Sequence, residues 1–338
     1  MTPIPKQQIG AMIPETKCQQ IRGAVIAILA IALVLVCGVA SGADHYVGTI
    51  ATLTNAAKIA VSNDVIWISN GTYTCTTPMG YAFLELADGV TLRSLSGNPN
   101  DVVLDGNASN SVIYMNSFST WLIGCTVTNG YTDGNIAGGG ISGSNGGSAS
   151  NCIVVGNFAN GMDGGGMRNI KGYNLLIINN TASTPAHGGG ATYGSVYNCI
   201  ISGNTADPGG GLWECEAWNT ISWGNSSVDY FGATIESYSC GEGYTGTGSI
   251  TNDPLFVGGG NYRLQASSSC INTGTNGSWT VRARDLDGNQ RIWPYGGTVD
   301  MGAYEFGSKA KYFTFRIGGT SIFNPGGTGL GNVRGTIE

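Results

Sequence analysis

A motif of the approximate form Asn-Cys-x-Ile-x-x-Asn recurs through the middle of the chain and limits its possible folds more than any other feature. Its copies occupy residues 151–157, 174–180, 198–204 and 219–225, and a looser copy lies at 124–130. Glycine triplets separate them, at 138–140, 164–166, 188–190 and 209–211. Because a fixed short period is typical of solenoids, we expect each copy to belong to one rung, meaning one circuit of the chain, stacked on the next.

Each copy has the length and alternation of a short β-strand. Alternation places the second residue of the motif and the residue two positions later on one face. The period is too short for a propeller blade, and the helical pattern of an α-solenoid is missing. Glycine supplies 56 residues without a three-residue period, which excludes collagen, and 41% apolar residues are too many for a disordered chain. The sequence therefore predicts an all-β protein, a single-stranded right-handed parallel β-helix.

Stacking of the rungs predicts ladders of equivalent residues. Small apolar groups are expected to line up inside the solenoid at Cys125, Cys152, Leu175 and Cys199. Asparagine tolerates left-handed backbone conformations, and its amide can bond to its copy in the next rung. We therefore expect an asparagine ladder at the bend, formed by Asn157, Asn180, Asn204 and Asn225. The glycine triplets are expected to form tight corners.

The two ends of the repeat differ from its middle. A short amphipathic helix is expected over 54–62, followed by a strand at 65–69, a turn at 70–73 and strands around 90–93 and 102–104. Such a helix would cap the first rung, since a bare end exposes unpaired backbone. The repeat ends near Ile250. The expected organisation is a targeting segment over 1–43, a β-helix with its N-terminal helical cap over 44–250, an irregular C-terminal cap over 251–306 and a tail over 307–338.

The N-terminus has the pattern of an export signal. Lys17 and Arg22 precede an uncharged apolar run over 23–40, and small residues lie just before Asp44. This predicts a secretory signal cleaved near Ala43. The alternative is an uncleaved membrane anchor, because the run just reaches the length of a short membrane span. A secreted or cell-surface location follows, and contact with a membrane is expected only through this segment if it is uncleaved.

Several segments resemble a known group of proteins. They are 89–94 (Gly-Val-Thr-Leu-Arg-Ser), 103–106 (Val-Leu-Asp-Gly), the repeats themselves, and near the end 253–257, 261–264, 285–289, Arg291 and 299–306. Over roughly residues 45 to 306, the chain resembles secreted bacterial right-handed β-helix proteins of the pectate-lyase-like superfold, in particular those with a choice-of-anchor Q region. The resemblance implies a protein of the bacterial envelope. Such proteins often end in a sorting tail, whereas 307–338 has no long apolar span or terminal basic cluster, so the means of attachment stays open.

Because many β-helix proteins act on polysaccharides, the enzyme hypothesis depends on particular residues rather than on the fold. A glycoside hydrolase needs two facing carboxyl groups, and a lyase needs a cation or metal together with a base. The candidate catalytic residues lie in the loops before the glycine triplets, at differing offsets: Asp133, Asp163, His187 and Asp207. The only cations that the repeats offer are Arg168 and Lys171.

Metal, cofactor and disulfide signals are weak. Asp285 and Asp287 belong to a turn with Gly288 and Asn289, and Gly296 stands where a calcium loop would need a further acidic ligand, so Ca²⁺ has no supporting motif and no cofactor is identified. No CxxC pair indicates zinc. The seven cysteines beyond residue 43 are odd in number and irregularly spaced, which makes a poor disulfide framework.

An aromatic-rich stretch offers a second kind of site. Trp213, Trp218 and Trp223 could stack on sugars, although packing against the C-terminal cap is the commoner fate of such rings. The net charge of −6 and the lack of a basic cluster disfavour nucleic acid and other polyanions. We therefore expect a non-catalytic, adhesin-like or carbohydrate-binding protein whose partner is an extracellular polysaccharide or cell-surface glycan. The alternatives are a polysaccharide lyase or glycoside hydrolase, and a subunit that assembles end to end.

Overall fold

The computed structural model describes residues 42–134, 138–232, 236–277, 279–280, 283–294, 296–308, 312–317 and 320–325. The predicted targeting segment, except for residues 42 and 43, and most of the predicted tail lie outside these ranges. Within them, no helix has the length and apolar character needed to cross a membrane.

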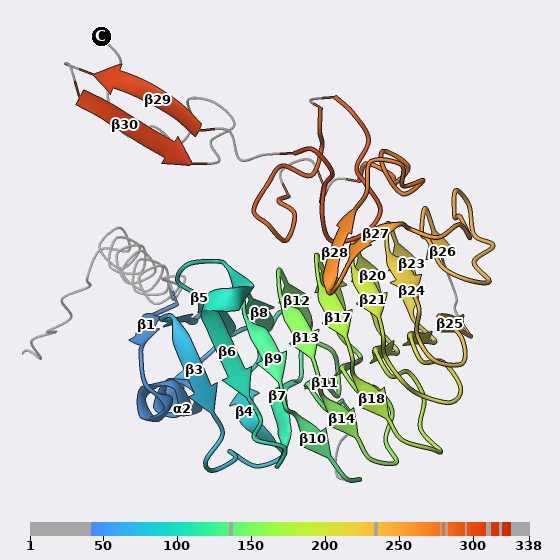
Figure 1. The fold of residues 1–338 in the computed structure, drawn as a ribbon. Helices are drawn as coiled ribbons and strands as arrows, with labels where there is room; N and C mark the ends of the chain where they lie inside the picture. The colour runs from blue at the N-terminus through green and yellow to red at the C-terminus, as the bar shows by residue number, and fades with distance from the viewer. Residues whose placement is uncertain are drawn as a thin grey trace, which may run out of the picture. The chain divides into compact units, whose positions relative to one another are not determined.

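The described chain winds through parallel β-sheets that run along a solenoid (Figure 1). Sheet A contains β1 (Asp44–Val47), β2 (Val65–Ile68), β5 (Thr91–Ser94), β8 (Trp121–Ile123), β12 (Ser148–Ser150), β16 (Lys171–Tyr173), β20 (Ser195–Tyr197), β23 (Glu216–Trp218) and β26 (Glu236–Ser237). Sheet B contains β3 (Gly71–Thr74), β6 (Val102–Asp105), β9 (Thr126–Thr128), β13 (Ile153–Val155), β17 (Leu176–Ile178), β21 (Ile200–Ser202) and β24 (Ile221–Trp223).

Sheet C contains β4 (Ala82–Leu86), β7 (Ser111–Met115), β11 (Ile141–Gly143), β15 (Met167–Arg168), β19 (Ala191–Thr192), β22 (Leu212–Trp213) and β25 (Tyr230–Phe231). A short sheet D contains β10 (Tyr131–Thr132), β14 (Phe158–Ala159) and β18 (Thr181–Ala182). Strands from successive rungs pair in parallel, as β13 does with β17 and β17 with β21. The predicted parallel β-helix is confirmed.

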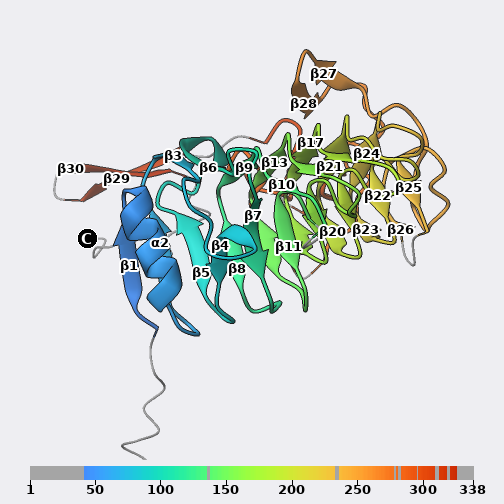
Figure 2. The same ribbon diagram turned by 90° about the horizontal axis from the view of Figure 1, so that it is seen from below.

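A helix covers the first rung, as predicted, but it lies earlier in the sequence than expected. Helix α2 spans Ile50–Ile59 and packs on β1, β2 and β4 (Figure 2). It begins early because Thr49 and Thr52 form a capping box, in which each hydroxyl accepts a hydrogen bond from the other residue's main-chain N–H. The predicted turn at 70–73 was wrong, since Gly71–Thr74 forms β3 and pairs with β6.

The interior of the solenoid contains the ladder that the repeat predicted. Cys125, Cys152, Leu175 and Cys199 have no exposed surface and belong to one hydrophobic core. Each directly precedes a strand of sheet B. The middle residue of that strand, such as Val154, points to the same side and is also fully buried. Because these thiols sit among apolar side chains, burial raises the pKa of Cys152 to about 11 and that of Cys199 to about 12. They are packing groups.

The predicted asparagine ladder is present, with Asn157, Asn180 and Asn204 buried and Asn225 partly exposed. The Nδ2 amide of each member donates to Oδ1 of the next: Asn157 to Asn180 at 2.9 Å, Asn180 to Asn204 at 3.0 Å and Asn204 to Asn225 at 2.9 Å. The same oxygens also accept main-chain N–H groups, for example that of Asn180 on Asn204 at 2.9 Å. Each asparagine therefore joins two rungs through its side chain.

The expected left-handed backbone occurs at a different asparagine. It belongs to the first residue of each motif, with φ of 52° at Asn151, 52° at Asn174, 50° at Asn198 and 48° at Asn219. At these positions the chain turns from sheet A to sheet B, and asparagine is among the few residues that adopt this conformation readily. The two asparagines of the motif thus have different tasks: the first bends the backbone and the second links the rungs.

The glycine triplets are required by close contact between rungs. A Cβ atom on Gly166 would lie 2.5 Å from the carbonyl oxygen of Gly190 and 3.0 Å from Nδ2 of Asn180. The corner itself is formed by the first glycine of each triplet, such as Gly164 with φ of 76°. The other glycines leave room for the asparagine ladder, which is why the two sequence features recur together.

The C-terminal segment packs along the outer face of sheet B. Its Leu264, Leu286 and Met301 form one apolar cluster with Ile200 and Ile221 of that face. The first asparagines of the motif hold it through hydrogen bonds, because Nδ2 of Asn198 donates to the carbonyl oxygen of Asp300 and Nδ2 of Asn219 to that of Thr275. The segment contains an antiparallel pair, β27 (Phe256–Gly258) and β28 (Asn261–Leu264).

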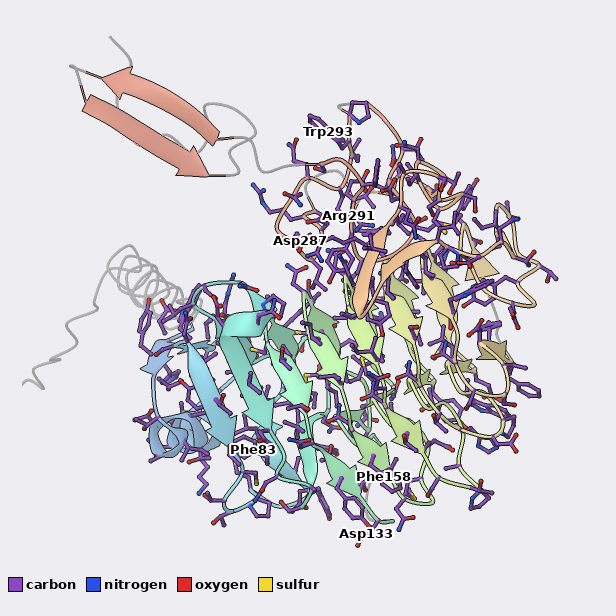
Figure 3. All side chains as sticks on the ribbon, viewed as in Figure 1. Phe83, Asp133, Phe158, Asp287, Arg291 and Trp293 are labelled. Atoms are coloured by element: carbon purple, nitrogen blue, oxygen red, sulfur yellow. The ribbon has the colours of Figure 1, made fainter. Side chains whose placement is uncertain are left out.

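Polar residues of this segment are mainly structural. Asp285 Oδ1 accepts the main-chain N–H groups of Asp287 and Asn289, which matches the predicted turn. Arg291 is fully buried and donates to the carbonyl oxygens of Asp300 and Gly302 (Figure 3). Three elements complete the list: the 3₁₀ helix η1 (Pro99–Asp101) and the antiparallel hairpin of β29 (Tyr312–Ile317) and β30 (Thr320–Pro325).

Candidate functional site

Two of the predicted catalytic residues are hydrogen-bonded to each other. Asp163 and His187 each directly precede a glycine triplet, so they occupy the same position in successive rungs, and Gly164 donates to the carbonyl oxygen of His187. Asp163 Oδ1 accepts the main-chain N–H of His187 at 2.9 Å and lies 3.0 Å from its Nδ1. The two side chains are 25% and 31% exposed. With the proton on Nδ1, the carboxylate orients the ring and Nε2 is left as an acceptor.

A stack of rings continues from this pair along sheet C. The His187 ring lies 4.0 Å from that of Trp213 on β22, and Trp213 lies 4.5 Å from Phe231 on β25, with an interplanar angle of 5°. Both faces of Trp213 are therefore covered. Phe231 is 46% exposed, and β25 is the last strand of sheet C in the described part of the chain. Its ring ends the stack.

At the corner that follows sheet C, two residues adopt a left-handed backbone conformation that is unfavourable for their residue type. Asn169, Tyr193, Glu214 and Gly232 follow successive strands of this sheet, with φ of 54°, 54°, 47° and 72°. Asparagine and glycine adopt such angles readily, whereas other residues lose about 1–2 kcal/mol. Tyr193 and Glu214 therefore adopt a backbone conformation that tyrosine and glutamate disfavour. Strain of this kind is concentrated at functional positions.

The charges of neighbouring side chains act on Tyr193. Burial raises the pKa of Tyr193, and the carboxylates of Asp163 and Glu214 raise it further, while a side-chain hydrogen bond with Trp213 and the charge of Arg168 lower it. The Arg168 guanidinium carbon lies 5.4 Å from the centre of the Tyr193 ring. Between Arg168 and Trp213 on the same ladder, the buried Thr192 hydroxyl has no hydrogen-bond partner among the described residues. We name this region the sheet C site, and it consists of Asp163, Arg168, His187, Thr192, Tyr193, Trp213, Glu214 and Phe231.

The sheet C site combines an open aromatic ring with several hydrogen-bonding groups. The site contains two carboxylates, of Asp163 and Glu214, and one guanidinium, of Arg168, so it lacks the surplus of positive charge that an anionic ligand requires. Hydroxyl groups of a ligand would find acceptors in Asp163, Glu214 and Nε2 of His187, and donors in Arg168 and Tyr193. This chemistry suits a neutral, hydroxyl-rich molecule.

The other two predicted catalytic residues lie elsewhere. Asp133 borders a shallow hollow with Tyr81, Asn110 and Tyr131, near Phe158 of β14 and on the side away from Arg291 (Figure 3). Asp207 borders another hollow, where its Oδ1 lies 3.5 Å from the Ser227 hydroxyl. Neither is hydrogen-bonded to Asp163 or His187. Lys171 lies on sheet A over the ring of Phe118, so it belongs to a different face from Arg168.

The predicted tryptophans occupy three different sheets. Trp213 belongs to the sheet C site. Trp218 ends a column on sheet A in which Tyr173, Tyr197 and Trp218 stack at 4.9 and 4.8 Å, with Trp279 meeting Tyr197 edge-on at 5.5 Å. Trp223 lies on sheet B and packs against the apolar cluster of the C-terminal segment. Most of these ring faces are covered by neighbouring rings or by that segment.

Metal ligands are not clustered in the part of the chain that the structure describes. No group of three or more His, Cys, Asp and Glu side chains there is arranged to hold a metal ion. Asp285, where a calcium loop was considered, has its carboxylate engaged by the main-chain N–H groups of Asp287, Asn289 and Glu305.

Comparison with known proteins gives likeness of architecture alone. No family model and no curated protein matches the chain. Among solved structures, the pectate lyase Pel9A has a TM-score of 0.38 and 15% identity, covering 79% of this chain and 97% of its own. A PL6 family polysaccharide lyase from Pseudopedobacter saltans has a TM-score of 0.33 and 16% identity, covering 58% of this chain and 46% of its own. The PL6 family alginate lyase AlyGC has a TM-score of 0.27 and 15% identity, with coverages of 60% and 39%.

Sequence reasoning did not identify Tyr193 and Glu214 as members of the site. Both directly follow a two-residue strand of sheet C and lie outside the repeated motif, so the motif does not mark them. A signal was nevertheless present. Aligned on the glycine triplets, the third residue after the triplet is Gly143 in one rung and Asn169 in the next, so a tyrosine and a glutamate at this position depart from the local preference.

Proposed function

We propose that the chain is an exported β-helix protein of the bacterial surface or extracellular space that binds a neutral, hydroxyl-rich carbohydrate at the sheet C site without cleaving it. The observation that carries this proposal is the exposed Phe231 ring, which ends a stack on Trp213 and His187. Sugars present an apolar face that packs on aromatic rings, while their hydroxyl groups bond to polar neighbours. Asp163, Tyr193 and Glu214 supply such neighbours.

Export is supported by the apolar run over 23–40 and the small residues that follow it. The segments in 253–306 that resemble a choice-of-anchor Q region support a place in the bacterial envelope. An adhesin-like role fits a solenoid of stacked parallel sheets with a binding surface on one of them. The neutral glycan is preferred because the site has two carboxylates for one guanidinium and the whole chain carries a net charge of −6.

A polysaccharide lyase or glycoside hydrolase is the second candidate, and one observation favours it. The hydrogen bond between Asp163 and His187 is the arrangement that orients a histidine as a general base, and Tyr193 and Arg168 lie nearby. A lyase acting on uronates would need a surplus of positive charge to neutralise the substrate carboxylate. The excess of carboxylates at the sheet C site is unfavourable for that step, so binding without cleavage is the better supported function.

Retention and turnover can be measured on one panel of polysaccharides. The full chain is passed over immobilised neutral and uronate-containing polysaccharides, and the eluates are assayed for unsaturated and reducing-end products. We expect retention on a neutral polysaccharide and no product. Phe231→Ala should lower the affinity about tenfold, the equivalent of about 1.4 kcal/mol. The control Tyr46→Ala removes a ring that is 67% exposed and stacked on Trp67 at the other end of the solenoid.

Each outcome decides between the candidates. Products that disappear in His187→Ala would establish the enzyme and overturn binding without cleavage. Retention that Tyr46→Ala weakens as much as Phe231→Ala would place the binding surface elsewhere. A chain that neither binds nor cleaves any member of the panel would contradict both carbohydrate proposals.

A further inference from the structure

Two buried cysteines meet where the solenoid joins its C-terminal segment. Cys240 follows the last described strand of sheet A, and its main chain forms isolated parallel β-bridges with Ile221 and with Ile250. Cys270 belongs to the C-terminal segment, and its carbonyl oxygen accepts the N–H of Met301. Both side chains are fully buried in the same apolar cluster, where interaction with the Cys270 side chain helps raise the pKa of Cys240. The Cys240 thiol also faces the main-chain carbonyl oxygen of Asn252 at 3.2 Å. They are separated in sequence but belong to one buried cluster.

The other cysteines have a different environment. Cys125, Cys152, Cys199 and Cys215 point into the solenoid, where each thiol faces a main-chain carbonyl two residues earlier, as Cys199 faces that of Tyr197. Cys75 also belongs to this interior. Only Cys240 and Cys270 among the described cysteines lie in the cluster between sheet B and the C-terminal segment. An odd total of cysteines is therefore compatible with one specific pair.

We propose that Cys240 and Cys270 form a disulfide bond when the protein folds in an oxidising compartment, linking the last rung to the C-terminal segment. The oxidant is a second disulfide, either a small molecule such as glutathione disulfide or a dithiol oxidase. One cysteine thiolate attacks it and releases one thiol, and the other cysteine then displaces the second thiol from the mixed disulfide. Two protein thiols become one disulfide, and the oxidant disulfide becomes two thiols.

The bond has to form before the segment has fully docked. In the folded chain both sulfur atoms are inaccessible, and contact with Cys270 together with burial raises the pKa of Cys240, so the reactive thiolate is scarce. During folding, by contrast, both thiols are exposed. The disulfide would then restrict the unfolded chain and hold the C-terminal segment against sheet B. This inference rests on the export part of the proposed function and is independent of the carbohydrate site.

The test uses the full chain refolded from denaturant in a glutathione redox buffer. The product is quenched in acid, denatured and alkylated without reduction, and its peptides are mapped by mass spectrometry. We expect a linked pair of peptides containing Cys240 and Cys270, with a mass about 2 Da below their sum. Cys152→Ser should keep this pair, whereas Cys240→Ser should leave Cys270 alkylated. The oxidised chain should also unfold at a higher urea concentration than the reduced chain.

Alkylation of both residues in the refolded wild-type chain, or a dominant pairing of either one with a different cysteine, would overturn the proposal. Because the decisive map is made on the wild-type chain, it does not depend on whether a cysteine variant folds. Failure to form the bond would leave carbohydrate retention untouched, and loss of retention would leave the peptide map untouched. The two proposals therefore fail separately.

Discussion

Asn225 donates twice to one oxygen of Asp229: its Nδ2 lies 2.9 Å and its main-chain nitrogen 3.0 Å from Asp229 Oδ1. In earlier rungs the equivalent oxygen belongs to the amide of the next asparagine, which passes a hydrogen bond onward. A carboxylate accepts and does not donate, so the ladder ends here. Burial raises the pKa of Asp229. Asp229 thus supplies the last acceptor of the ladder.

Asn204→Ala should lower the free energy of unfolding by about 3 kcal/mol. It leaves the main-chain N–H and the Nδ2 amide of Asn180 without their buried acceptor, and the carbonyl oxygen of Ile177 without its donor. Urea unfolding of the variant measures the loss. Asn145→Ala is the control, since this exposed side chain bonds, among the described residues, to Asn116 alone, and its loss should cost less than about 1 kcal/mol. Equal losses in the two variants would contradict a stabilising ladder.

Gly166→Ala should prevent the rungs from stacking. Its Cβ would lie 2.5 Å from a carbonyl oxygen of the next rung, and neither backbone can move without breaking its own hydrogen bonds. We expect little soluble, cooperatively folded protein. Gly156→Ala is the matched comparison, because a Cβ atom there would lie 3.8 Å from its nearest neighbour. Only the φ of 65° is unfavourable for alanine, and it should cost about 1–2 kcal/mol of stability. Circular dichroism and gel filtration of both variants test the difference, and a well-folded Gly166→Ala chain would disprove the steric argument.

Tyr193→Asn should stabilise the chain by about 1 kcal/mol, since asparagine tolerates the φ of 54° that tyrosine adopts there. The same change should weaken carbohydrate retention, because it removes a ring and a hydroxyl from the sheet C site. Urea unfolding and retention are measured together. In Tyr197→Asn the change should instead destabilise, because this ring stacks between Tyr173 and Trp218 on sheet A. A less stable Tyr193→Asn would show that the corner carries no strain.

Glu305 should make the fold less stable as the pH rises. Burial raises its pKa from 4.5 to about 8, with a further increase from Asp300 and a partial decrease from Arg291. Between about pH 4.5 and 8 the folded chain keeps a proton that the unfolded chain has released, so stability from this group falls across that range. Glu305→Gln, which stays uncharged, should flatten the dependence. Urea midpoints of both chains across this range provide the measurement, and parallel curves would exclude the group.

The solenoid was predictable because its physics is local and repeated. Equivalent residues recur at fixed spacing, so the interior cysteines and the asparagine ladder could be assigned from the sequence. The sequence did not reveal which asparagine of the motif bends the backbone and which links the rungs. Both tolerate a left-handed backbone, and only the strand register in the structure distinguishes them. The lateral packing of the C-terminal segment was also hidden, since residues 251–306 have no period that indicates which face they cover.

The candidate site was predictable only in part. Asp163 and His187 directly precede their triplets, whereas Asp207 lies one residue and Asp133 several residues further away. Equal offset places side chains on one ladder, which explains why only the first two meet. Tyr193 and Glu214 lie at the corner after sheet C, and Phe231 lies on its last described strand. Neither position belongs to the repeated motif, so the sequence repeat could not assign these residues to the site.

The asparagine ladder has a consequence for how such a chain changes over generations. Every rung offers its successor the same donors and acceptors that it receives from its predecessor, as Asn180 does between Asn157 and Asn204. A duplicated rung inserted there would find both neighbours complete, and an excised one would leave no orphaned amide. Unequal recombination can therefore lengthen or shorten the protein by whole rungs, while α2 at one end and Asp229 at the other stay as they are.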